Sequence, residues 1–180
     1  MKTSYIIPIA LAGLLCSACD LSVTNPGPVQ DSQLNNASAV PALVNGMSGD
    51  LSLAIGNFLI GNTVMTDELI HSGNYAAPNE FALGIIRPAD VDPDYQNLQQ
   101  ARWVAEDGLR RMKTVLGSTF ETDPNTPRAY LYAGFANRLL GENSCQAVID
   151  GGPAQSDSVY FQRAESLFTR ANTLATALKN

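Results

Sequence analysis

The chain has 180 residues, 45 % of them hydrophobic and 16 % charged, which is long enough for one domain with a substantial core. Disorder is disfavoured, because it combines low hydrophobicity with high charge. Seventeen acidic and 11 basic side chains give a net charge of −6, so nucleic acid is not an expected partner. One histidine and three cysteines leave too few ligands for a zinc cluster and little material for a histidine-based triad. We therefore expect no metal site and no cofactor.

The first residues have the pattern of an export signal. The apolar stretch at 6–15 is too short to span a ~30 Å hydrocarbon core but has the length of a signal-peptide core. Ser17 and Ala18 stand directly before Cys19, and small residues in this position resemble the end of a bacterial lipoprotein signal. The resemblance implies that the Cys19 thiol is acylated, with palmitate as a typical chain. Cys16 departs from the pattern, since leucine is usual at that position.

Two interpretations of this segment remain, a lipoprotein signal or a soluble export signal that leaves Cys19 as a free thiol. We favour the first and expect a lipoprotein signal peptide at 1–18. A lipidated N-terminus with an extended tether is expected at 19–37, where the Asn25-Pro26-Gly27-Pro28 segment blocks helix and sheet. No later segment reaches 18 uninterrupted apolar residues, so the lipid is the only membrane attachment that we expect.

Cys145 is the thiol that remains once Cys16 is removed and Cys19 is lipidated, so no intrachain disulfide is expected. Cys145 is either a reactive nucleophile or a small buried hydrophobic residue. The second is favoured, because the single histidine, His71, lies far away in the sequence. Without a visible pair of nucleophile and base, we expect no enzymatic activity.

Helical periodicity begins after the tether. Apolar residues within 40–58 follow the three-and-four spacing of one helical face, with Ser38 as the expected N-cap and Pro41 in the first turn. Residues 63–71 predict a short helix or an irregular turn. The glycines and prolines of residues 72–93 predict a long loop, and loops of that length are often functional.

Three further helices are expected, at 95–116, 128–140 and 159–178. The first is the cleanest amphipathic helix, and Gly117 follows it as a stop signal. The second is apolar on nearly all faces, which is typical of a helix buried in the middle of a fold. Polar residues at 142–158 predict a loop. Since no strand pattern of useful length is present, the predicted fold class is all-α.

The last two expected helices resemble a tetratricopeptide unit, in which small residues let two helices approach and an aromatic fills the gap. The matching positions are Tyr130, Ala133 and Gly134 in the first helix and Ala164, Phe168 and Ala171 in the second. The loop between these helices is longer than the tight turn of the repeat, and only one unit is evident. We thus expect antiparallel helix pairs that resemble tetratricopeptide repeats, with long loops.

Several segments occur in a distinctive order along the chain. They are the lipoprotein signal before Cys19, LSVTNP at 21–26, TDEL at 66–69, YQNLQQARW at 95–103 and RAYLYAGF at 128–135. This order resembles the N-terminal part of the SusD/RagB family of outer-membrane nutrient-binding lipoproteins. Because members are usually several hundred residues long, the resemblance implies that the helical region at 38–180 is incomplete.

The resemblance to SusD/RagB also implies a function and a location. It implies a non-enzymatic lipoprotein that is anchored in the outer membrane at the cell surface through its lipid. Such a protein captures an oligosaccharide or a peptide for import by a TonB-dependent transporter, its expected partner. The alternative is a lipid-anchored, tetratricopeptide-like scaffold that binds a protein partner.

Four residues are candidates for ligand binding. Tyr75, Asn79 and Phe81 lie in the expected long loop, where an exposed aromatic beside an amide suits sugar recognition. The alternative is a structural role, in which these side chains only hold the loop against the protein. Trp103 lies on the polar side of its expected helix and either stacks on a sugar ring or packs between two layers. For Trp103 we favour the packing role.

Asp90, Asp92 and Asp94 alternate as in a calcium-binding loop. The glycine and the bidentate glutamate of an EF-hand are absent, because Tyr95 and Ala101 occupy those positions. A solvated acidic turn that caps the following helix is the favoured interpretation.

Overall fold

The computed structural model describes residues 30–179, and residues 34–179 belong to one compact unit. The described part contains five α-helices, three short 3-10 helices and one two-stranded sheet. The expected all-α fold is therefore confirmed, whereas the likeness to tetratricopeptide repeats stays a prediction. The signal peptide at 1–18, the lipidation site Cys19 and most of the tether lie outside the described residues.

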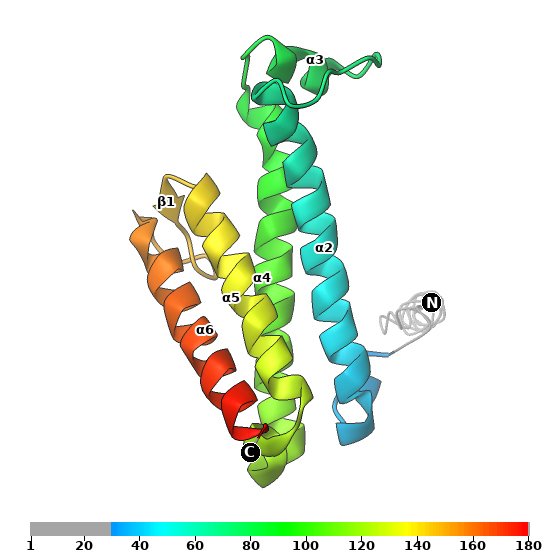
Figure 1. Ribbon diagram of the computed structural model, residues 1–180, viewed down its shortest axis with the longest axis vertical. Coiled ribbons are helices and arrows are strands. Elements are labelled where there is room, and N and C mark those ends of the chain that lie inside the picture. The colour runs from blue at the N-terminus through cyan, green and yellow to red at the C-terminus, as the bar shows by residue number, and fades with distance from the viewer. Residues whose placement is uncertain (1–29, 180) are drawn as a thin grey trace, which may run out of the picture. The chain divides into compact units, whose positions relative to one another are not determined.

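Four long helices make up most of the compact unit (Figure 1). The elements are η1 Asp31–Leu34, η2 Ala37–Ala39, α2 Val40–Met65, α3 Ala76–Ala82, α4 Pro88–Leu116, η3 Gly117–Thr122, α5 Asn125–Asn143, β1 Gln146–Ala147, β2 Gln155–Ser156 and α6 Ser158–Ala177. Helix α4 packs against both α2 and α5, and α6 packs on α5. Strands β1 and β2 pair antiparallel within the connection from α5 to α6.

Helix α2 differs at both ends from the expected helix. The N-cap position of α2 is Ala39 and not Ser38, and the preceding η2 is capped by Asn36, whose Oδ1 accepts from the Ala39 backbone N–H at 3.1 Å. At the other end, α2 continues to Met65 and includes the first residues of the segment 63–71, for which a separate short helix or irregular turn is expected from the sequence. The apolar face persists beyond residue 58, since Gly61 and Val64 are also buried.

The prediction of a long loop at 72–93 is wrong. Helix α3 lies within it and is held by the buried Phe81, and α4 begins at Pro88. A proline in the first turn of a helix loses no intrahelical bond and has a suitable φ, so Pro88 starts α4 instead of preventing it. Pro93 lies inside α4, where it lacks one backbone donor near the N-terminal end.

Two other segments that were expected to be irregular are partly ordered. In the tether, the Gln33 backbone N–H donates to the carbonyl of Gln30 at 2.9 Å, and residues 31–34 form a 3-10 turn rather than extended chain. In the loop at 142–158, Gln146 pairs with Ser156, and Ala147 is fully buried.

The end of α4 and the bounds of α5 and α6 agree with the apolar periodicity of the sequence. Helix α4 ends at Leu116, and Gly117 follows with φ 53°, a left-handed conformation that favours glycine. Helices α5 and α6 lie within a few residues of their expected bounds. The prediction that α5 is buried on all sides is wrong, because Leu131 and Arg138 are exposed on one side of the helix.

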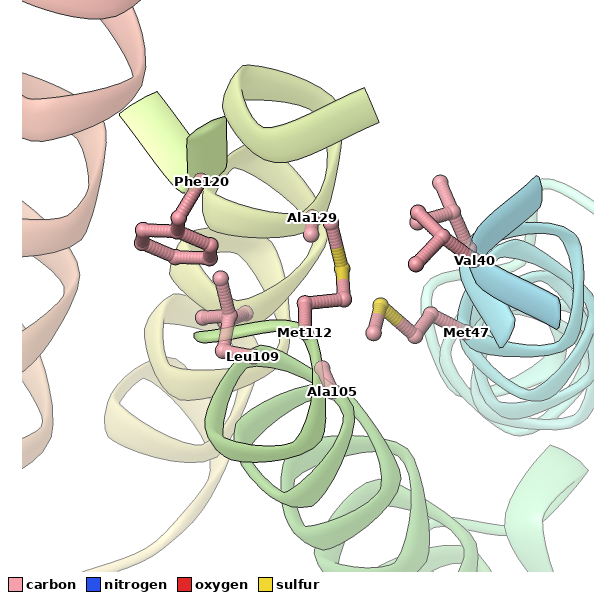
Figure 2. Packing of buried hydrophobic residues seen from close by; sticks show 9 residues of the cluster. Val40, Met47, Ala105, Leu109, Met112, Phe120 and Ala129 are labelled. Atoms are coloured by element: carbon pink, nitrogen blue, oxygen red, sulfur yellow. The ribbon is translucent and has the colours of Figure 1, made fainter. Parts of the chain in front are cut away.

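A core cluster joins α2, α4 and α5 at one end of the unit. Its buried members are Val40, Val44, Met47, Ala105, Leu109, Met112, Phe120, Ala129 and Ala133. Figure 2 shows Met47 extending from α2 toward α4, while the side chain of Met112 of α4 extends toward Ala129 of α5. A Cβ atom on Gly108 would lie 1.9 Å from the Met47 methyl carbon, so the glycine permits the close approach of α2 and α4.

Helices α5 and α6 also approach closely. A Cβ atom on Gly134 would lie 2.6 Å from the ring of Phe168, and that ring meets Phe135 edge-on with centroids 5.1 Å apart. Ala164 and Ala171 are both buried on α6. The small residues singled out in the sequence therefore lie in a tight contact.

Enlarging either alanine is expected to destabilise this contact. Ala164→Leu or Ala171→Leu should lower the free energy of unfolding by about 1–3 kcal/mol, because added methylene groups overpack a filled interface. Ala177→Leu, at an exposed position of the same helix, is the matched control and should have little effect. Denaturant unfolding measures all three. Unchanged stability of both buried variants would refute the tight packing.

By length and composition alone, the helical segment Ala37–Met65 is apolar enough to cross a membrane, with a mean hydropathy of 1.2 over 18 residues. The mostly buried core helix of a soluble protein passes the same test, but in this helix only 22 % of the window is buried. Here α2 packs along α4 and α5 through its buried residues. We therefore interpret it as a helix of the bundle.

Candidate functional site

A hollow of about 540 Å³ lies where α4 meets the loop between β1 and β2. Helix α4 contributes Gln99, Gln100 and Trp103, and the loop contributes Val148 and Asp150. Trp103 is 53 % exposed, so its indole lies at the surface and does not pack between two layers. Of the four candidate ligand residues, Trp103 is the one that lines this hollow.

Arg102 lies beneath the hollow and is only 3 % exposed. Its Nε donates to Gln99 Oε1 at 3.0 Å, its Nη1 to Glu106 Oε2 at 2.8 Å and its Nη2 to Asp150 Oδ1 at 2.8 Å. Burial alone would lower the pKa of Arg102, but the hydrogen bond to Asp150 and the two carboxylate charges outweigh it and raise the pKa. The Arg102 guanidinium thus holds the side chains of Gln99, Glu106 and Asp150 in place.

Gln99 is fixed from its other side by two phenol groups. Its Nε2 donates to the hydroxyl oxygens of Tyr95 and Tyr160, at 2.7 Å in each case. The Tyr160 hydroxyl in turn donates to the Val148 carbonyl at 3.1 Å and accepts from its backbone N–H at 3.3 Å. Burial raises the pKa of Tyr160, so the phenol stays protonated at neutral pH. These bonds hold the loop against α4.

Asp150 presents a carboxylate at the edge of the hollow. Its backbone has φ 50°, a left-handed conformation that is uncommon outside glycine, and it directly precedes Gly151 in the turn. The hydrogen bond from Arg102 lowers the pKa of Asp150, which keeps the carboxylate ionised at neutral pH. Because 63 % of the side chain is exposed, it also faces solvent beside Trp103.

The polar network extends from Glu106 into α5 and α6. Glu106 Oε1 accepts from Asn137 Nδ2 at 2.9 Å and from Arg163 Nη2 at 2.7 Å. Arg163 Nε also donates to Asn137 Oδ1 at 3.2 Å. The network therefore ties the floor of the hollow to three helices.

Sequence reasoning did not find Arg102, Glu106 or Asp150. One local signal was available, since Arg102 and Glu106 have the i, i+4 spacing of a helical ion pair. Another was Asn137 in an otherwise apolar helix, because a buried amide needs polar partners. Neither signal points to Asp150, which comes from the distant loop.

The other candidate residues lie elsewhere. Tyr75 is exposed directly before α3, and Asn79 is exposed on that helix. Phe81 is buried and lines a second hollow, so the structure does not bring these three residues to Trp103. Cys145 is exposed, which contradicts the expectation of a buried residue; Ala147 takes the buried place in this segment.

Within residues 30–179, no group of three or more histidine, cysteine or acidic side chains is placed to hold a metal ion. Compared with protein-family models, curated proteins and solved structures, the sequence shows no match. The resemblance to the SusD/RagB family accordingly stays a prediction that rests on the order of the sequence segments.

Proposed function

We propose that the protein is a non-enzymatic, lipid-anchored outer-membrane protein that captures an oligosaccharide in the Trp103 hollow. In this proposal it delivers the sugar to a TonB-dependent transporter. The observation that carries the choice of ligand is the half-exposed indole of Trp103 beside fixed amide and carboxylate groups. The lipid anchor and the transporter come from the sequence resemblance.

The hollow has the two kinds of surface that a sugar ring requires. The indole offers an apolar face on which the C–H face of a ring can stack. Gln100 offers amide donors and acceptors, and the ionised Asp150 accepts strong hydrogen bonds from hydroxyl groups. Since Arg102 already orients Asp150, little conformational freedom is lost on binding.

The carboxylates near Trp103 are poorly suited to glycoside hydrolysis. A general acid needs a raised pKa, and the pKa of Asp150 is lowered by Arg102. Glu106 is engaged by Arg102, Asn137 and Arg163. These contacts favour binding without cleavage.

Removing the indole is expected to abolish most of the sugar binding. Trp103→Ala should weaken affinity about tenfold or more, because an aromatic anchor at the centre of a site contributes much of the binding energy. An array of neutral oligosaccharides identifies the best binder for the wild type, and calorimetric titration then compares the variants. Tyr75→Ala removes an exposed aromatic outside the hollow and should leave binding unchanged.

Three outcomes would count against the proposed ligand site. They are absence of any glycan binding by the wild type, unchanged affinity of Trp103→Ala, and a loss that appears only in Tyr75→Ala. Capture of a peptide in place of a glycan would overturn the substrate class while leaving the uptake role in place.

Anchoring through Cys19 is tested separately. Cys19→Ala should move the protein from the membrane fraction to the soluble fraction, since the acyl chains are the expected attachment. Cys16→Ala keeps the acylated thiol and is the matched control. Fractionation and intact-mass measurement report the result. Membrane retention of Cys19→Ala, together with a wild type that has no acyl mass, would contradict lipidation.

A second candidate function is a scaffold that binds a protein partner. It is favoured by the exposed apolar residues between positions 59 and 86, because such patches mark interaction sites. These residues are Leu59, Ile60, Leu69, Ile70, Leu83, Ile85 and Ile86. Binding of a protein through this surface with no glycan binding would favour the scaffold.

A further inference from the structure

A second hollow, of about 690 Å³, lies among the end of α2, helix α3, the start of α4 and the segment after α5. Its size falls in the range of small-molecule sites. Its walls are largely apolar and include Phe58 and Met65 of α2, Phe81 of α3 and Leu98 of α4. No lysine, arginine or histidine is among the described residues that line it.

Two carboxylates line this hollow, the half-buried Asp94 and the exposed Asp92. A Cβ atom on Gly61 would lie 3.8 Å from Asp94 Oδ2 and 3.5 Å from the ring of Phe81. The carboxylate and the ring therefore both face the bare backbone of Gly61. Asp94 Oδ2 thus lies beside Gly61 of α2 at the wall of the hollow.

Asp94 has no cationic partner within residues 30–179, in contrast to two carboxylates farther along α4. Glu106 and Asp107 are both paired with arginine. Asp94 makes no hydrogen bond or ion pair with the described residues, and burial raises its pKa. A partly desolvated carboxylate without a partner is unfavourable, and a cation beside it would remove that penalty.

We propose that this hollow binds a small organic amine with an apolar or aromatic body. The ammonium group pairs with Asp94, Asp92 adds a second negative charge, and the face of Tyr95 offers a cation–π contact. The apolar body lies against Phe58 and Phe81. The site is distinct from the Trp103 hollow, although Tyr95 and Val148 border both.

Three probes of similar shape separate charge from hydrophobicity. They are 2-phenylethylamine, 2-phenylethanol and phenylacetate, titrated into the purified full chain and followed by amide chemical shifts in NMR spectra. The amine should bind at least about tenfold more tightly than the alcohol, and the anion should bind least. Equal affinities of amine and alcohol, or no shifts up to about 10 mM amine, would overturn the proposal.

Two substitutions test whether the preference for the amine over the alcohol arises in this hollow. Asp94→Asn should reduce the preference for the amine to threefold or less, whereas Glu165→Gln removes an exposed charge on α6 and should keep it. A thermal melt checks that Asp94→Asn is folded, which is expected because an unpaired carboxylate is removed. A preference that persists in Asp94→Asn, or that is lost in Glu165→Gln, would contradict the site.

Filling the hollow gives a second test that does not depend on charge. Gly61→Val places a side chain between Phe81 and Asp94 and should weaken amine and alcohol binding alike. Gly56→Val, on the same helix with no neighbour within 4 Å of its Cβ, should not. If Gly61→Val and Gly56→Val bind the amine and the alcohol equally well, the probes bind outside this hollow. Trp103→Ala should keep amine binding, so the failure of one proposal is distinguishable from the failure of the other.

Discussion

Replacement of Glu106 by alanine is expected to lower the free energy of unfolding by about 3–5 kcal/mol. The guanidinium of Arg102 is buried, and Glu106 Oε2 lies 2.8 Å from its Nη1. Without the carboxylate, a buried cation keeps only partial compensation from Asp150 on the exposed loop. Asn137 and Arg163 lose their shared acceptor at the same time, which leaves a buried amide with one fewer partner.

Glu142→Ala is the matched control for this loss. Glu142 also forms an i, i+4 pair with an arginine, Arg138, at 2.7 Å, but both side chains are exposed to solvent. Exposed pairs of this kind contribute about 0–1 kcal/mol, so urea unfolding should separate the two variants clearly. Similar small losses in both would show that Arg102 does not depend on Glu106.

The same substitution is expected to affect ligand binding. Arg102 orients Gln99 and Asp150, so its displacement would disturb the polar groups beside Trp103. Glu142 has no contact with this network, and its variant should bind like the wild type. If both results hold, the buried network acts as structural support for the proposed Trp103 binding site.

Much of the fold could be predicted because apolar periodicity decides the position of amphipathic helices. The end of α4 at Leu116 and the extent of α6 follow from that pattern together with Gly117 as a stop signal. The start of α4 was missed because prolines were treated as helix breakers. Pro88 occupies the first turn, where a missing backbone donor costs nothing, so composition alone gave the wrong answer there.

The site could be predicted only in part, for a different physical reason. Trp103 stands out on the polar side of its helix, but the packing role favoured for it from the sequence is wrong, because its side chain is 53 % exposed. The partners that make a site around it are distant in sequence: Asp150 is 48 residues from Arg102, and Arg163 is 57 residues from Glu106. Such pairs depend on how the α5–α6 connection folds back on α4, and no local pattern encodes that.

The position of α5 in the middle of the helical unit can be tested by truncating one leucine. Leu140 is fully buried and packs in a cluster with side chains from α2, α4, β1 and α6. Leu140→Ala should cost about 2–5 kcal/mol, because it removes buried methyl groups and leaves a cavity among four elements that cannot all move inward.

Leu131→Ala makes the same chemical change on the same helix, where the side chain is 39 % exposed. Its loss should stay below about 1 kcal/mol, since surrounding water already reaches the site and no closed cavity forms. Denaturant unfolding compares the two free energies of unfolding directly, provided that both variants show the same dependence of that free energy on denaturant concentration. The difference depends on burial alone, because helix propensity changes equally in both variants. If the two substitutions cost the same, α5 would not be covered by α2, α4 and α6 as described, and the tight α5–α6 contact would lose its support.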